Sequence, residues 1–179
     1  VAVGVAKRIL HDALAYSLDR KQFGQAICDF QLVQAMLADS QAELYAAECM
    51  TIDAARRRDA GQNVSTEASS AKMFATEMCG RVADRAVQIL GGSGYMAEYG
   101  IERFYRDVRL FRLYEGTTQI QQIIIARNMV RDAKFGDDLD ARDRAQQPAQ
   151  AQARQRLVIG DHHPDRAHRA TASSKTMSR

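Results

Sequence analysis

The sequence has 179 residues, of which 46% are hydrophobic and 26% charged, with 11 glycines and two prolines. This is ordinary globular composition, and it excludes collagen-like, disulfide-scaffold and wholly disordered chains. The net charge of +3 comes from residues 133–179, which hold nine basic and six acidic side chains, while residues 1–132 hold 16 of each. The first 132 residues therefore show no basic stripe of the kind that binds nucleic acid.

Two long helices are predicted at the start of the chain. Apolar residues recur with a period close to 3.6 over residues 1–20, and Gly24 then lies in a break. A second helix is expected over residues 30–58, because apolar side chains again gather on one side. Gly61 follows that helix directly and is a natural C-cap.

A third helix is expected to run to about Leu90, where the glycine pair 91–92 stops it. Asn63 or Ser65 can cap its first turn. A short helix near residues 101–108 follows. No stretch of the sequence alternates convincingly with the period of two that a strand requires.

The last strong helix is expected from Thr118 to about Arg131. Thr118 and Gln121 have the spacing of a capping box, in which two side chains satisfy the first backbone donors of a helix. The predicted fold over residues 1–132 is therefore all-α, an up-and-down four-helix bundle.

Residues 133–179 differ in composition from residues 1–132 and are rich in alanine, glutamine and arginine. Such a segment has too few apolar residues to offset its ordering entropy, so we expect a disordered tail. His162, His163 and His168 lie in it, but no cysteine or carboxylate set completes a metal site, so no metal is expected.

The apolar runs, the cysteines and the first residue bear on the cellular compartment of the protein. No run of 18 apolar residues predicts a membrane-spanning helix, and no signal peptide is visible. Cys28, Cys49 and Cys79 lie far apart, so we expect reduced, mostly buried thiols in a cytoplasmic protein, or one of the mitochondrial matrix in a eukaryote. The first residue is Val1 rather than Met, so we expect the true start to lie upstream.

The segment 91–118 is too long and too rich in glycine, tyrosine and arginine for a simple bundle turn. Glu115 lies in it just before a helix N-terminus, where a carboxylate suits general-base catalysis or merely complements the helix dipole. Arg20 and Arg109 can bind a phosphate bidentately, and surface ion pairs are the alternative for each.

Three stretches in register carry a resemblance to a known family. They are DRKQFGQAICDFQ at residues 19–31, QILGGSGY at 88–95 and YRDVRLFRLYEGTTQIQ at 105–121. Together they resemble the C-terminal helical domain of the acyl-CoA dehydrogenases over roughly residues 1–131. The family's N-terminal helical domain and middle β-domain have no counterpart in the chain, so we expect the final domain of an enzyme separated from its other two.

The resemblance implies FAD as cofactor and an acyl-CoA thioester as substrate. Glu115 is then the base that removes the α-proton, with its backbone N–H polarising the thioester carbonyl, and Gly116 contacts the substrate. Hydride leaves the β-carbon for the flavin. The residues implied to contact FAD, which spans a subunit interface in this family, are Arg20, Phe23, Gln31, Gln88, Ile89, Leu90, Gly91, Gly92, Thr117, Thr118 and Gln119.

The resemblance further implies a dimer or tetramer, or pairing with full-length homologous subunits, and electron-transferring flavoprotein as electron acceptor. Two positions depart from the family pattern, with Thr118 in place of Ser and Gln122 in place of Arg. Two alternatives remain open. One is a non-catalytic module that holds FAD or mediates oligomerisation, and the other is a bundle that binds a partner helix without flavin.

Overall fold

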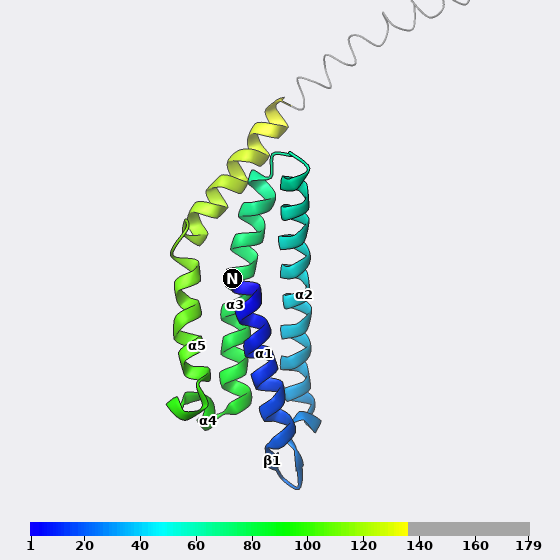
Figure 1. Ribbon diagram of the computed structural model, residues 1–179, viewed down its shortest axis with the longest axis vertical. Helices are drawn as coiled ribbons and strands as arrows, with labels where there is room; N and C mark the ends of the chain where they lie inside the picture. Colours follow the sequence, from blue (N-terminus) through cyan, green and yellow to red (C-terminus); the bar gives the residue numbers. More distant parts are fainter. Residues whose placement is uncertain (136–179) are drawn as a thin grey trace, which may run out of the picture. The chain divides into compact units, whose positions relative to one another are not determined.

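Three long helices form the body of the computed structural model, which describes residues 1–135 (Figure 1). They are α1 (Ala2–Asp19), α2 (Gln31–Asp59) and α3 (Ser65–Leu90), and successive helices run in opposite directions. The fourth part of the bundle is made of consecutive shorter helices. These are α5 (Ile101–Val108), the 3-10 helix η3 (Arg109–Arg112) and a helix that begins at Thr118 and continues through residue 135. The predicted up-and-down helical bundle is confirmed. The disordered tail was predicted from residue 133, but residues 133–135 continue the last helix, and the rest of that prediction lies outside the described residues.

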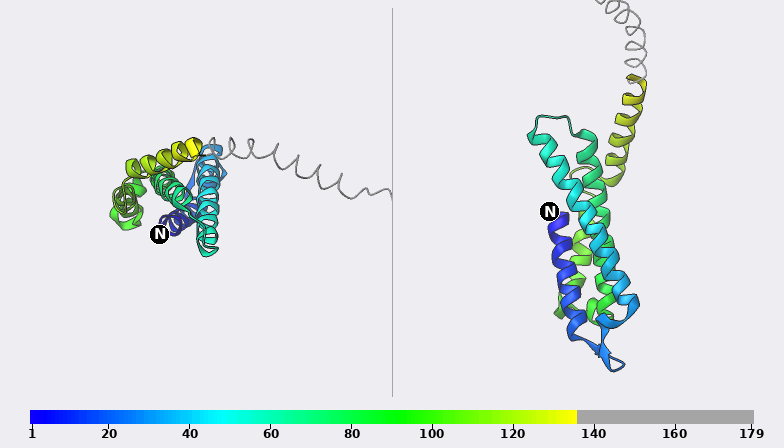
Figure 2. Two further views of the ribbon diagram at one scale, coloured as in Figure 1. Left: turned by 90° about the horizontal axis from the view of Figure 1, so that it is seen from above. Right: turned by 90° about the vertical axis from the view of Figure 1, so that its right-hand side faces the viewer.

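The hydrophobic core is centred on α3, which packs against α1, α2 and α5 (Figure 2). Many of its buried residues are small, and alanines let neighbouring helices approach closely, while Ile9, Met78 and Val82 fill the space between them. Ile101 and Val108 attach α5 to the same core. Residues 1–132 form one compact unit around it.

A two-stranded hairpin occupies the break between α1 and α2. Strand β1 (Lys21–Gln22) pairs with β2 (Gln25–Ala26) in antiparallel fashion, and Phe23 and Gly24 form the turn with φ of 52° and 83°. Two consecutive positive φ angles are typical of the tightest hairpin turns. The break at Gly24 was predicted, but the strands were not. A 3-10 helix, η1 (Ile27–Asp29), leads into α2.

The helix ends agree with the sequence at Gly61 and differ at Gly92. Gly61 has φ of 78° directly after α2, and the Asn63 side chain accepts a hydrogen bond from the Ser65 N–H at the start of α3. Gly91, with φ of 60°, ends α3 as expected. Gly92 does not continue the break but begins the short helix α4 (Gly92–Tyr95), and the 3-10 helix η2 (Ala97–Tyr99) follows it.

The three cysteines are free thiols in three different environments. Cys79 is buried in the core, and burial raises the pKa of its thiol to about 11. Cys28 is half-buried and Cys49 is exposed, so the expectation of mostly buried thiols is wrong for Cys49. Within residues 1–135, no helix is long and apolar enough to cross a membrane, and no group of three ligating side chains could hold a metal ion.

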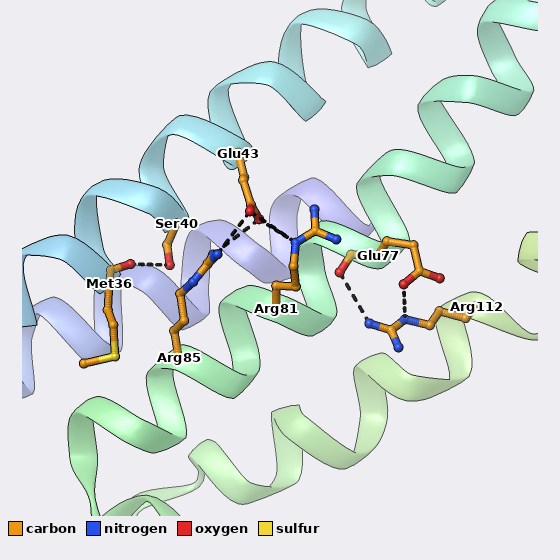
Figure 3. A network of polar contacts seen from close by, with 7 residues as sticks. All are labelled: Met36, Ser40, Glu43, Glu77, Arg81, Arg85 and Arg112. Carbon is orange, nitrogen blue, oxygen red and sulfur yellow. Dashed lines mark hydrogen bonds and ion pairs between the residues drawn. The ribbon is translucent and has the colours of Figure 1, made fainter. Parts of the chain in front are cut away.

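A polar contact joins α2 to α3 beside the core (Figure 3). The Glu43 carboxylate lies 3.0 Å from Arg81 Nε and 3.1 Å from Arg85 Nη2. Partial burial opposes ionisation of Glu43, but the hydrogen bonds from Arg85 and Arg81 outweigh it and hold the pKa of Glu43 below its ordinary value. The ionised form of Glu43 therefore stabilises the fold.

Replacing Glu43 with glutamine is expected to lower the free energy of unfolding by about 1 kcal/mol at pH 7, because charge-assisted hydrogen bonds are lost. A lowered pKa in the folded state adds stability above pH 4.5, the ordinary value for Glu43, and that stability is lost as the pH falls below it. Urea titrations at pH 7 and at pH 3 measure the difference. Asp53→Asn, which breaks an exposed pair with Arg57, should change stability less. An effect of Glu43→Gln that persists at pH 3 would contradict this role.

Candidate active site

Glu115 lies in a tight turn between η3 and the helix that begins at Thr118. It is exposed and has φ of 54°, and Gly116 follows with φ of 83°. Within residues 1–135, Phe23 is the other non-glycine residue with a positive φ. Such a conformation is rare for an L side chain and is found mostly where the surroundings impose it.

The same residue borders an apolar cavity of about 390 Å³. The cavity lies where α1 begins, between α2 and α3, and among the described residues Glu115 is the one carboxylate of its lining. A carboxylate at the edge of an apolar cavity has the surroundings that proton abstraction from a carbon acid needs. The full lining is Val1, Ala2, Val3, Thr51, Ala54, Ala68, Ala71, Lys72, Ala75, Thr76, Phe111, Tyr114 and Glu115.

The helix after this turn is capped by Thr117 and not by Thr118. The Thr117 hydroxyl accepts a hydrogen bond from the Ile120 N–H at 3.4 Å. Thr118 is buried, and its hydroxyl donates to Glu77 Oε1 at 2.9 Å. Gln121 also differs from the predicted capping box, because its amide donates to the carbonyl oxygens of Glu115 and Gly116 at 3.2 and 3.3 Å.

Two further residues of α3 hold the segment that contains Glu115, and sequence reasoning missed both. Lys72 Nζ donates to the Gly116 carbonyl at 2.6 Å. Glu77 forms an ion pair with Arg112, whose Nε lies 3.1 Å from Glu77 Oε2 without the alignment of a hydrogen bond (Figure 3). Gly80 makes room for this arginine, since a Cβ there would lie 2.2 Å from Arg112 Nη2.

A second set of predicted site residues lies at the hairpin end of the bundle, where the hairpin and α4 are found together (Figure 1). The Tyr16 hydroxyl joins α1 to α4 there by a hydrogen bond to Ser93 Oγ at 3.1 Å. Arg20, Phe23 and Gln31 are exposed at this end, and residues 88–92 span the end of α3, Gly91 and the start of α4. The predicted site residues therefore form two groups. One lies at the hairpin end of the bundle, and the other contains the turn at Glu115 and residues 117–119.

The residues from 88 to 92 differ in what they offer a ligand. The side chains of Ile89 and Leu90 are buried in the core, which leaves only their backbone available. Gln88 is exposed. A Cβ at Gly91 or Gly92 would meet nothing within 4 Å, so a ligand can approach the backbone closely.

Arg109, the other arginine suggested by the sequence for phosphate binding, lies outside both groups. It lines a different cavity, of about 540 Å³, between α3 and α5. Arg81, Arg106 and Arg112 share that lining, together with Asp84. Arg109 forms no ion pair with another residue of 1–135, and its binding of a phosphate stays a prediction.

The family model of the acyl-CoA dehydrogenase C-terminal domain matches residues 1–130. This chain belongs to the acyl-CoA dehydrogenase family. It is 47% identical over 131 residues to the probable acyl-CoA dehydrogenase YngJ of Bacillus subtilis, which is 73% of this chain and 34% of YngJ. It is 45% identical over 130 residues to the caffeyl-CoA reductase-Etf complex subunit CarC of Acetobacterium woodii, with the same two coverages.

A solved structure of the family has the same fold. Butyryl-CoA dehydrogenase from Megasphaera elsdenii superposes with a TM-score of 0.71 at 36% sequence identity, over 72% of this chain and 34% of that protein. The chain thus spans about a third of the length of the acyl-CoA dehydrogenases that it matches.

Members of this family are FAD-dependent, and the hairpin end of the bundle fits the polar part of that cofactor. Arg20 is exposed and forms no ion pair with another residue of 1–135. A guanidinium of this kind suits a pyrophosphate. Gln31 and Gln88 add exposed hydrogen-bonding groups, and the open backbone at Gly91 permits close approach.

Proposed function

We propose that this chain is the C-terminal helical part of an FAD-dependent enzyme that desaturates an acyl-CoA thioester between its α- and β-carbons. The observation that carries the proposal is the placement of Glu115. It lies in a turn fixed by hydrogen bonds at the edge of an apolar cavity. Membership of the acyl-CoA dehydrogenase family supports the same activity.

In this proposal Glu115 removes the proton from the α-carbon of the substrate. The backbone N–H of Glu115 donates a hydrogen bond to the thioester carbonyl and stabilises the charge that develops there, and Gly116 contacts the substrate beside it. The apolar cavity offers a non-polar surface beside the carboxylate for the acyl chain. FAD, when bound, supplies the acceptor for the hydride that leaves the β-carbon.

The cofactor is proposed to lie across an interface between two copies of this chain. Arg20, Phe23 and Gln31 of one copy would hold its pyrophosphate together with residues 88–92 of the other, and Thr117, Thr118 and Gln119 would lie along it. A dimer, or a dimer of dimers, follows from such a shared site. Electron-transferring flavoprotein is the proposed electron acceptor, which the similarity to an Etf complex subunit supports.

A chimera tests the proposal. Residues 1–131 of this chain replace the matching third of the Megasphaera elsdenii butyryl-CoA dehydrogenase. We expect a yellow oligomer that desaturates butyryl-CoA. Arg20→Ala should weaken flavin retention by about tenfold or more, because an arginine–phosphate contact is lost. Flavin absorbance after gel filtration and a dye-reduction assay measure both properties.

The matched control is Arg58→Ala, an exposed arginine at the far end of α2 from the hairpin. It should leave flavin content unchanged. A folded chimera that binds flavin but does not oxidise butyryl-CoA would favour the non-catalytic, FAD-holding module. A folded chimera whose flavin retention is indifferent to Arg20 would contradict the proposed cofactor site.

A further inference from the structure

The turn that presents Glu115 cannot hold its shape by local preference alone. Two consecutive residues, Glu115 and Gly116, have φ of 54° and 83°. Glycine adopts this region freely, but a glutamate rarely does. Contacts from outside the turn must therefore maintain its conformation, and they can be traced to two side chains.

Both backbone carbonyls of the turn accept hydrogen bonds from side chains. The Gln121 amide donates to the Glu115 carbonyl at 3.2 Å and to the Gly116 carbonyl at 3.3 Å. Lys72 Nζ donates to the Gly116 carbonyl at 2.6 Å, the shortest of the three contacts. A Cβ on Gly116 would lie 2.7 Å from the Gln121 amide nitrogen, so glycine at this position lets the Gln121 side chain reach the two carbonyls.

Lys72 is unusual because its charge is directed at the protein backbone. It is half-buried on α3, beside the alanines 68, 71 and 75 that line the same cavity. Within residues 1–135 its ammonium forms no ion pair with a carboxylate. A charged donor gives a stronger hydrogen bond than a neutral one, and the hydrogen bond joins the turn to a rigid helix 44 residues earlier in the sequence.

The same helix also holds both flanks of the turn. Glu77, one and a half turns after Lys72 on α3, pairs with Arg112 before the turn and with the Thr118 hydroxyl after it. The ends of the segment are therefore fixed by Glu77, which leaves Lys72 as the contact from α3 to the turn itself.

We propose that Lys72 is a positioning residue for Glu115. Its hydrogen bond to the Gly116 carbonyl holds the turn in the left-handed conformation that directs the Glu115 carboxylate and N–H toward the substrate. The role of the turn in catalysis rests on the proposed function, whereas the conformational role of Lys72 does not. The two are therefore tested by separate measurements.

The first measurement is hydrogen exchange on the 179-residue chain, read by mass spectrometry. Lys72→Met removes the ammonium but keeps the length of the side chain, and the Gly116 carbonyl retains its Gln121 hydrogen bond, so the fold should survive. Amides of residues 114–121, among which Tyr114, Ile120 and Gln121 donate hydrogen bonds within the turn and the first turn of the helix after it, should exchange about tenfold faster, while those in the middle of α2 and α3 keep their rates. Lys72→Arg, which retains a charged donor, should restore most of the protection.

Lys7→Met is the matched control, because Lys7 is an exposed lysine of α1 that pairs with Glu48. It should leave the exchange of residues 114–121 unchanged. Unchanged exchange in Lys72→Met, or equal acceleration along the whole of α3, would overturn the proposal. If Lys72→Met does not fold, Lys72→Gln gives the same test with a neutral polar side chain.

The second measurement is steady-state kinetics in the chimera with butyryl-CoA dehydrogenase. A misplaced base should lower kcat by about ten- to a hundredfold and leave KM nearly unchanged, and Lys72→Arg should recover most of the loss. Faster exchange with an unchanged kcat would overturn the positioning role. If Glu115→Gln itself has no effect on kcat, the proposed function fails, and the exchange experiment still decides whether Lys72 holds the turn.

Discussion

Replacing Glu115 with glutamine should lower the turnover of butyryl-CoA by the chimera by about 10²–10⁴-fold, the usual contribution of a general base. Glutamine has nearly the same shape and keeps its hydrogen-bonding reach, but it cannot accept the α-proton. The backbone of the turn is held by Lys72 and Gln121 through carbonyl oxygens, so the substitution should not disturb it. The dye-reduction assay at saturating substrate measures the change.

Flavin retention separates this effect from loss of the cofactor. Arg20 and the turn at Gly91 lie at the hairpin end of the bundle, away from Glu115, so Glu115→Gln should bind as much flavin as the parent. Glu98→Gln, at an exposed glutamate of η2, should keep full activity. Near-normal desaturation by Glu115→Gln would place the base elsewhere in the protein and refute the main assignment of the site.

The long helices could be predicted from the sequence because their signals are local. Apolar residues repeat every three or four positions along α1, and a glycine with positive φ follows α2 at Gly61, as its position suggested. The hairpin was missed because each strand has two residues, too few to show alternation. Gly24 was the one residue that indicated an interruption between the two helices, and it did not indicate that the interruption is a hairpin.

The start of the last helix at Thr118 was predicted correctly, but its capping residue was predicted wrongly by one position. Thr117 and Thr118 have the same capping chemistry, and their local sequence does not separate them. Glu77 decides between them, because it binds the Thr118 hydroxyl from a helix 41 residues earlier and draws that side chain into the protein. Thr117 is then the residue that remains at the cap.

The contacts that shape the candidate site are likewise long-range. Glu115 and Gly116 were found because they lie in the motif at residues 105–121. Lys72 and Glu77 lie outside all three motif stretches, so nothing in the local sequence marked them. Gly80 offered a partial signal, since a glycine inside a long helix is costly without a packing reason. The reason is the Arg112 side chain that passes over it.

The largest expected effect on folding is at Met78. Its side chain is fully buried in the middle of α3, where the core of residues 1–132 is centred. Met78→Ala removes apolar atoms and leaves a cavity that surrounding helices fill only in part, so the free energy of unfolding should fall by about 2–5 kcal/mol.

Urea unfolding followed by circular dichroism measures the change, which should appear in the midpoint with little change in the slope. Met129→Ala is the matched control, because Met129 is 63% exposed and the same atoms are removed there from water and not from the core. It should alter stability by less than about 0.5 kcal/mol. Equal effects of the two substitutions would mean that α3 is not the centre of the core. A loss at Met78 alone means that α3, the helix that holds Lys72 and Glu77 against the turn at Glu115, is packed at the centre of the core.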